Sequence, residues 1–174
     1  MGSKYDVNQK INLHGYVDSD STSNTNARKS TSGCCLSLGS DMISWFSWKQ
    51  SCVVLSTVEV EYVAACSASC NVVWLRKLLS DLFDLRLDVS CVFYDNQSCV
   101  KLLENHVFHD KSKHIEIKFH YIRDMVQRGA MKLQYIATDE QIADVLTKPL
   151  AIVKFDYFRE KLGVLQTEVP SKGK

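Results

Sequence analysis

The sequence predicts an α/β fold built on a mixed five-stranded sheet, with three antiparallel strands, two strands joined through helices, and helices on both faces. Three strand-like runs come first and only turns or loops separate them, which favours antiparallel pairing. Two more strand-like runs follow, each preceded by residues with helical periodicity, as expected for strands joined through helices. The chain has 174 residues, 45% of them hydrophobic, which is enough for one domain with a sizeable core.

The first three strands differ in how clearly the sequence defines them. In an extended first strand, Tyr16, Asp18 and Asp20 share one face. The following segment, 21–32, is rich in Ser, Thr and Asn, and predicts a solvated loop with Gly33 as the turn out of it. A Gly-Ser-Asp turn signal separates the second strand from the third. The predicted strands are 12–20, 34–38 and 43–48.

Beyond residue 50 the spacing of apolar residues becomes helical. Ser56 and Glu59 form a capping-box signature at the start of a long helix. An almost continuous apolar run then predicts a strand covered on both faces, and Asp95 stands at its end. The predicted elements are the long helix to about 82, a strand at 89–94, helices at 96–103 and 113–128, a strand at 131–136, and helices at 142–148 and 153–162.

The predicted domain spans 12–163. We interpret 1–11 as a cloning remnant, Met1-Gly2-Ser3, followed by an incoming linker, and 164–174 as a polar tail. A net charge of +1 means that any nucleic-acid partner must meet a local basic face. We expect an intracellular protein, cytoplasmic or nuclear, without a membrane partner, because no apolar run approaches the roughly 18 residues of a membrane span. Seven cysteines and no signal-peptide pattern predict free structural thiols.

Four carboxylates stand near the ends of predicted elements, where they could converge on one site. Asp18 and Asp95 end apolar strands, where a solvated-surface explanation is weakest. Glu61 borders the apolar face of the long helix, whereas Glu59 points about 200° away; Asp144 lies in the helix after the last strand. Buried carboxylates need a counter-charge, a proton or a metal. A shared metal site and ordinary salt-bridged carboxylates both remain open from spacing alone.

Seven groups of residues, in this order along the chain, carry a resemblance to a known family. They are Gly15–Asp20; Arg28–Gly33; Ile43–Trp45 with Lys49-Gln50; Glu59–Ala64; Tyr94–Ser98; Lys113–Ile115 with His120–Arg123; and Gln141–Asp144 with Thr147–Leu150. The set resembles the ribonuclease H domain of copia-type LTR retrotransposon polyproteins, from about residue 14 to residue 162. The resemblance implies the ribonuclease H fold and metal-dependent cleavage of the RNA strand of RNA–DNA hybrids.

The family's four catalytic acids match Asp18, Glu61, Asp95 and Asp144. The resemblance implies that these residues bind two Mg²⁺ ions, for which Mn²⁺ can substitute, about 4 Å apart. Asp18 and Asp95 are the expected ligands common to both ions. Without metal, the clustered acids should repel one another and raise at least one pKa. The implied partners are an RNA–DNA hybrid and a reverse transcriptase domain of the same polyprotein.

The predicted substrate contacts lie in loops, at helix starts and on a basic segment. Loop cations could meet phosphates, and small polar groups at helix starts could read the 2′-hydroxyls of RNA. The segment 109–132 has six Lys or Arg against three Asp or Glu, which suits backbone contacts. The alternative is that all are turn, cap or solvated residues. The candidates are Arg28, Lys29, Ser30, Ser56, Thr57, Asn96, Gln97, Lys113 and His114.

The chain departs from the usual family pattern beside two of the acids. It has Ser21–Asn24 where the family has Trp and small residues, and Val58 and Val60 flank Glu59. All four acids are nevertheless intact, which favours an active hybrid nuclease. A catalytically silent copy that binds nucleic acid or protein is the alternative. An integrase or transposase of the same broad fold is disfavoured, because its Glu would be expected late in the chain.

Overall fold

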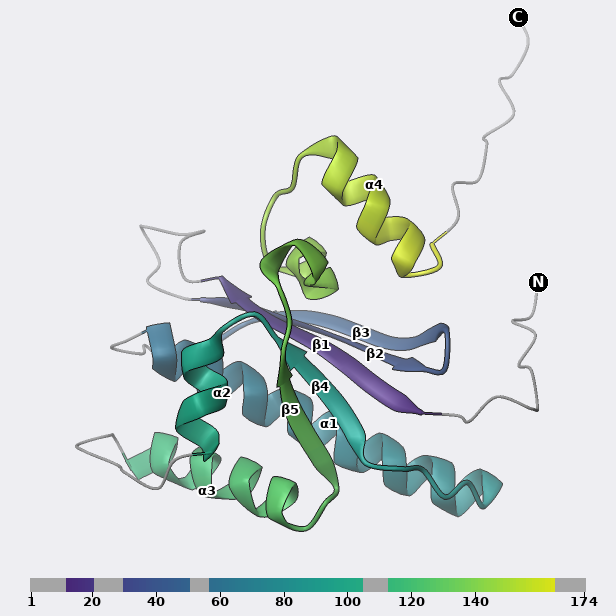
Figure 1. Cartoon of the computed structure of the whole chain (residues 1–174), viewed down its shortest axis with the longest axis vertical. Helices are drawn as coiled ribbons and strands as arrows, with labels where there is room; N and C mark the ends of the chain where they lie inside the picture. Colours follow the sequence, from purple (N-terminus) through teal and green to yellow (C-terminus); the bar gives the residue numbers. More distant parts are fainter. Residues whose placement is uncertain (1–11, 21–29, 51–56, 105–112, 165–174) are drawn as a thin grey trace, which may run out of the picture.

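A mixed five-stranded sheet forms the centre of the protein in the computed structural model, which describes residues 12–20, 30–50, 57–104 and 113–164 (Figure 1). The spatial order of the strands is β3-β2-β1-β4-β5. The first three pair antiparallel, β4 runs parallel to β1, and β5 runs parallel to β4. This confirms the predicted fold class. The strands are β1 (Leu13–Asp20), β2 (Thr31–Leu38), β3 (Asp41–Lys49), β4 (Ser90–Tyr94) and β5 (Met131–Tyr135).

Helices cover the two faces of the sheet unequally. On one face lie three α-helices, and on the other two short 3₁₀ helices and the last α-helix (Figure 1). The first group is α1 (Thr57–Phe83), α2 (Gln97–Glu104) and α3 (Lys113–Gln127); the second is η1 (Thr138–Glu140), η2 (Ile142–Leu146) and α4 (Ile152–Lys161). Within the described residues, no helix combines the length and hydrophobicity needed to cross a bilayer.

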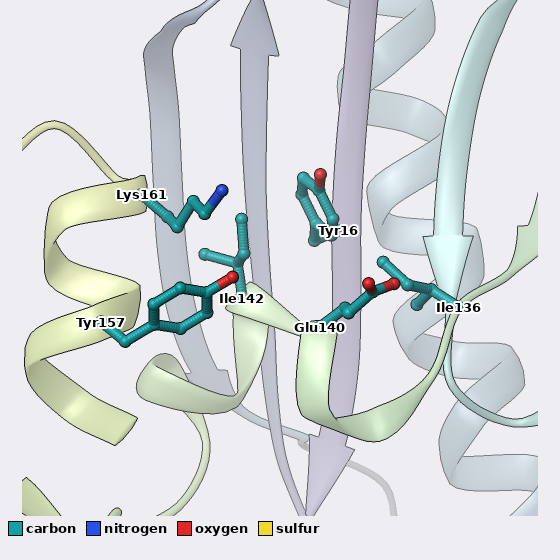
Figure 2. Close-up of a pocket in the computed structure, with 6 residues that line it drawn as sticks. All are labelled: Tyr16, Ile136, Glu140, Ile142, Tyr157 and Lys161. Atoms are coloured by element: carbon teal, nitrogen blue, oxygen red, sulfur yellow. The ribbon is translucent and has the colours of Figure 1, made fainter. Parts of the chain in front are cut away.

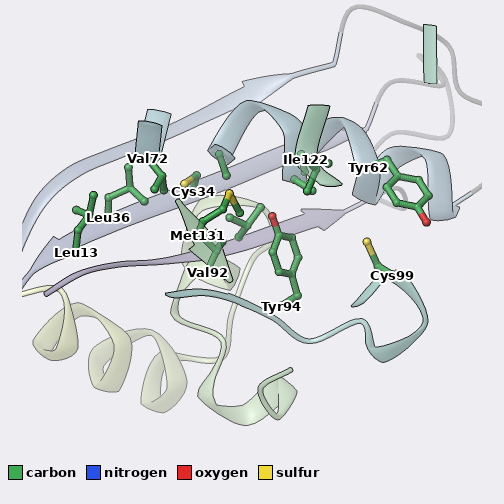
Figure 3. Packing of buried hydrophobic residues seen from close by; sticks show 14 of the residues in the cluster. Leu13, Cys34, Leu36, Tyr62, Val72, Val92, Tyr94, Cys99, Ile122 and Met131 are labelled. Atoms are coloured by element: carbon green, nitrogen blue, oxygen red, sulfur yellow. The ribbon is translucent and has the colours of Figure 1, made fainter. Parts of the chain in front are cut away.

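The main core lies between the sheet and the three helices of the first face (Figure 3). Alternate residues of β1 and β2 point into it, as the period of a strand requires. A smaller cluster on the other face joins Cys35 to Ile142, Ala143 and Phe158. This second cluster attaches η2 and α4 to the sheet. The labelled core residues are Leu13, Cys34, Leu36, Tyr62, Val72, Val92, Tyr94, Cys99, Ile122 and Met131.

Strand β2 begins three residues earlier than the sequence predicts, so Gly33 lies inside a strand and the prediction of a turn there is wrong. Of the predicted loop 21–32, residues 21–29 lie outside the described residues, and the part next to Gly33 is paired rather than solvated: buried Ser32 accepts a 2.7 Å hydrogen bond from Gln50 Nε2. Strand pairing on both sides therefore overrides the local composition. As a result, Gly33 is the direct partner of Asp18 across the β1–β2 pair.

Helix α1 continues without a break through the Ser- and Asn-rich residues 67–71. Ser67 and Ser69 donate hydrogen bonds to carbonyls four residues earlier, and so does Asn71. The polar groups of these side chains form hydrogen bonds with carbonyls of their own helix, and the backbone hydrogen bonds of the helix stay intact. The predicted helix at 142–148 is instead the short 3₁₀ helix η2, a form typical of such brief segments. The predicted remnant and linker, 1–11, lie outside the described residues, as does the predicted tail, 164–174, except for Val164, whose N donates to the Arg159 carbonyl at 3.1 Å.

Strand β4 is covered by helices on one face only, which corrects the expectation for its apolar run. Ser90, Val92 and Tyr94 are buried, whereas Cys91 and Phe93 are half-buried on the opposite face. There the ring of Phe93 stacks on Tyr16 of β1, with centroids 5.0 Å apart. Apolar residues on this face therefore pack against their neighbours in the sheet.

Candidate active site

Three carboxylates from three different elements converge at one edge of the sheet. Asp18 lies near the end of β1 and Asp95 follows β4 directly. Because β1 and β4 are parallel neighbours, their carboxyl ends meet at the same edge. Asp144, in η2, reaches this edge from the second face. One carboxylate oxygen of each residue lies within 4.8 Å of those of the other two, although Asp18 and Asp144 are only 3% and 0% exposed.

Glu61 of α1 is the fourth acid at this site. It is 9% exposed. Burial, followed by the charges of Asp18 and Asp95, raises its pKa to about 8. Glu59 is half-buried, so the structure buries the glutamate that the helical spacing favoured. The pKa of Asp18 is also raised, chiefly by burial, while Thr147 and Lys148 oppose the shift. The expected mutual repulsion of the acids is thus present.

Two lysines form ion pairs with Asp144, one at each carboxylate oxygen. Lys148 Nζ lies 2.8 Å from Oδ1, and Lys154 Nζ lies 3.2 Å from Oδ2. The Thr147 hydroxyl donates a hydrogen bond to Asp18 Oδ2. Sequence reasoning assigned no role to these three residues. The spacing of four between Asp144 and Lys148 is a signal for an ion pair, whereas Lys154 reaches Asp144 only through the packing of α4.

Two contacts hold η2, and hence Asp144, against the sheet. Gln141 is fully buried; its Nε2 donates to the Val17 carbonyl at 3.0 Å, and its Oε1 accepts from Ala143 N at 3.3 Å. At Gly33, an added Cβ would lie 2.7 Å from Leu146 Cβ and 3.2 Å from the Ala143 carbonyl oxygen. The absence of a side chain at position 33 therefore lets η2 approach β2 closely, beside the partner strand that carries Asp18.

The predicted substrate residues are only partly placed by the structure. Asn96 caps α2, since its Oδ1 accepts from Cys99 N at 3.1 Å, and Gln97 is exposed at the first position of that helix. Both follow Asp95 directly. Ser30 is buried, and its carbonyl accepts from Gln50 N, so little of it is open to a large substrate. Residues Arg28, Lys29 and Ser56, and the side chains of Thr57, Lys113 and His114, lie outside what the structure describes.

A cavity of about 230 Å³ lies on the second face of the sheet, between η1, η2 and α4 (Figure 2). Its polar groups are the Tyr16 and Tyr157 hydroxyls, the Glu140 carboxylate and the Lys161 ammonium, and its apolar lining is Ile136 and Ile142. None of the four acids lines it. The acidic site is therefore separate from this cavity.

The acidic site has a donor set that fits a divalent cation. The converging groups are carboxylates, and Mg²⁺ prefers oxygen ligands. Two of the three grouped acids are almost fully buried, so a cation there would offset a large cost of burying negative charge. Asp18, Asp95 and Asp144 are the residues that could hold it, with Glu61 beside them.

Comparison with known proteins gives two consistent findings, although no family model matches the chain. The chain is 39% identical over 163 residues to the Pol polyprotein of transposon RE2, and 41% identical over 161 residues to that of transposon RE1, both from Arabidopsis thaliana. It is 38% identical over 152 residues to the Pol polyprotein of transposon TNT 1-94 from Nicotiana tabacum. These alignments cover 94%, 92% and 87% of the chain, which spans only about 11% of each polyprotein.

Solved structures with a similar fold are ribonuclease H domains. The N-terminal RNase H domain of a Mycobacterium tuberculosis protein aligns with a TM-score of 0.56 and 12% identity, over 86% of this chain and 97% of that one. LC11-RNase H1, solved in complex with an RNA/DNA hybrid, aligns with a TM-score of 0.56 and 16% identity, over 78% and 93%. The chain thus has the ribonuclease H fold. The resemblance to the ribonuclease H domain of copia-type retrotransposon Pol polyproteins is confirmed.

Proposed function

We propose that the chain is a metal-dependent endonuclease of the ribonuclease H type, which hydrolyses the RNA strand of RNA–DNA hybrids. The observation that carries this proposal is the convergence of Asp18, Asp95 and Asp144, with Glu61 beside them, at one edge of a ribonuclease H fold. The homology to retrotransposon Pol polyproteins supports it, because reverse transcription produces RNA–DNA hybrids. We also propose that a reverse transcriptase domain of the same polyprotein is a partner of this chain.

The four acids would hold two Mg²⁺ ions, or Mn²⁺ in their place, with Asp18 and Asp95 common to both. When bound, such ions activate a water for in-line attack on the phosphate and stabilise the leaving 3′ oxygen. The chain's own residues fix the ligands: the Thr147 hydroxyl orients Asp18, and Lys154 orients Asp144. Glu61, with its pKa near 8, would give up its proton as it takes up a cation.

Substrate contacts are proposed for the surface beside Asp95. Asn96 and Gln97 begin α2 immediately after this acid, where backbone donors and side-chain amides can meet 2′-hydroxyls and phosphates. Arg28, Lys29, Ser30, Ser56, Thr57, Lys113 and His114 complete the proposed substrate-binding set. Of these, Ser30 has the weakest support because it is buried.

The direct test is digestion of a hybrid labelled on its RNA strand, with Mg²⁺, with Mn²⁺ and with EDTA. We expect RNA fragments from the hybrid in either metal and none in EDTA. The same RNA as a single strand or as an RNA duplex should stay intact. Intact RNA in the hybrid under both metals would refute the proposed nuclease activity. If the chain still bound the hybrid in that case, it would be a catalytically silent binding module.

Gly33→Ala tests whether the close approach of η2 to β2 positions Asp144. An added Cβ must push Leu146 and Thr147 away, so we expect a loss of about 1–3 kcal/mol in unfolding free energy. We also expect roughly tenfold weaker binding of Mn²⁺, because a displaced support costs metal affinity. Chemical denaturation and calorimetric titration measure the two effects.

Gly15→Ala is the matched control for this substitution. Its Cβ would collide with the Leu36 side chain in the main core, away from η2. It should lower stability comparably and leave metal affinity unchanged. Equal metal affinity in both variants would contradict the positioning role of Gly33.

A further inference from the structure

The ammonium group of Lys148 lies among the acids of the proposed active site. Its Nζ is 2.8 Å from Asp144 Oδ1 and 3.8 Å from Asp18 Oδ2. Its charge also acts on Asp95 and on Glu61. Burial alone would lower the pKa of Lys148, but the contact with Asp144 and the charges of Asp18 and Asp95 raise it. One permanently charged side chain therefore acts on all four acids.

Lys154 offers an informative contrast, because it pairs with the same aspartate from outside the cluster. Its Nζ lies 3.2 Å from Asp144 Oδ2, 3.3 Å from the Thr138 carbonyl and 3.8 Å from Asp139 Oδ1. Its ammonium also lies 5.3 Å from the ring centroid of buried Phe158. These contacts tie Lys154 to η1 and to its own helix, and Asp144 is the only one of the four acids among them.

The position of Lys148 conflicts with the binding of a divalent cation. The carboxylate oxygens of Asp18, Asp95 and Asp144 lie within 4.8 Å of one another, and a Mg²⁺ ion must approach its ligand oxygens to about 2.1 Å. An ammonium group 2.8 Å from Asp144 Oδ1 and 3.8 Å from Asp18 Oδ2 would lie against a Mg²⁺ ion bound to these two acids and would repel it. The Lys148 side chain is 32% exposed and has a flexible stem, so it can swing towards solvent. Lys154 lies at the other oxygen, Oδ2, and is also held by the Thr138 carbonyl and by Asp139.

We propose that Lys148 is an internal counter-ion that fills the cation position of the metal-free site and leaves Asp144 Oδ1 when a divalent cation binds, while Lys154 remains and positions Asp144. The inference rests on the proposed function, since it concerns the same metal site. The counter-ion explains how the metal-free protein can stay folded with several buried carboxylates close together. Metal affinity is then lower than the four acids alone would give, because each cation must displace a bound charge.

The test compares Lys148→Met with Lys154→Met, which remove one ion pair each from the same aspartate. Mn²⁺ binding is measured by calorimetry and by the spin-resonance signal of free Mn²⁺, without any nuclease assay. Lys148→Met should bind Mn²⁺ about tenfold more tightly than the native chain, as expected when about 1.4 kcal/mol of competition is removed. Lys154→Met should bind Mn²⁺ no more tightly than the native chain. In EDTA, Lys148→Met should have the lower unfolding temperature of the two.

A measurement on the native chain makes the test independent of variant folding. With the lysine side chains isotope-labelled, the Lys148 signal should shift to the position of a solvated lysine on Mg²⁺ addition, while the Lys154 signal stays. Unchanged Mn²⁺ affinity in Lys148→Met, or an unmoved Lys148 signal in Mg²⁺-bound protein, would overturn the inference and leave the proposed function standing. Absence of Mn²⁺ binding in the native chain and in both variants would refute both.

Discussion

Asp95→Asn is expected to abolish cleavage of the RNA strand while leaving the protein folded. The amide keeps the size of the carboxylate but removes a charge that both proposed cations share. Loss of supporting residues around a metal typically costs 10- to 100-fold, so loss of a shared ligand should lower the rate by at least about a hundredfold. Stability in EDTA should stay the same or rise, because one of the mutually repelling charges is gone. Hybrid digestion and thermal unfolding measure the two effects.

Asp20→Asn, at the end of strand β1, is the matched control for Asp95→Asn. Asp20 lies two residues after Asp18 at the end of β1 but is not part of the converging group. This variant should cleave the hybrid at nearly the native rate. Native activity in Asp95→Asn, or equal loss in both variants, would refute the assignment of the catalytic acids.

The metal-free protein is expected to lose stability as the pH rises towards 8, because of Glu61. Its pKa is about 8 in the folded protein against an ordinary value of 4.5. Between these values the folded state binds more protons than the unfolded state, so stability falls with increasing pH. Asp18, whose pKa is also raised, contributes with the same sign. Urea unfolding in EDTA at pH 6 and pH 8 should show a decrease on the order of 1–2 kcal/mol.

Glu61→Gln should remove most of this dependence, since the amide does not titrate. Glu59→Gln, two residues earlier on the same helix, is the control and should keep the native slope. Saturating Mg²⁺ should also weaken the slope, because the cation replaces the proton at Glu61. A native slope in Glu61→Gln would show that other groups cause the pH dependence.

The positions of the acids could be predicted from the sequence because the geometry of strands and helices determines where these residues lie. Asp18 and Asp95 end strands that pair in parallel, and parallel strands bring their ends together. Glu61 was separable from Glu59 because helical geometry turns two residues about 200° apart. These inferences need only the period of each element, and local sequence carries that information well.

The supports of the site depend on packing between distant segments, which local patterns do not encode. Gly33 resembles a turn residue in a polar segment, and only the contact of η2 with β2 explains why a glycine stands there. Gln141 fits a helix start, yet its side chain bonds to the Val17 carbonyl across the fold. Lys154 has no recognisable signal, because its partner belongs to another element. In this chain the helices and strands can be predicted from local sequence, whereas the side-chain contacts between distant elements cannot.

The placement of Asp144 on η2 has a consequence for the order of synthesis. Asp18 and its hydrogen-bond donor Thr147 are 129 residues apart along the chain, and Lys154 follows still later, in α4. A growing chain on the ribosome therefore exposes Asp18, Glu61 and Asp95 well before the segment that completes the site has emerged. Such non-local contacts form late. The fourth acid of the cluster arrives only with η2, so a nascent chain, or one shortened before residue 144, carries three acids without the fourth.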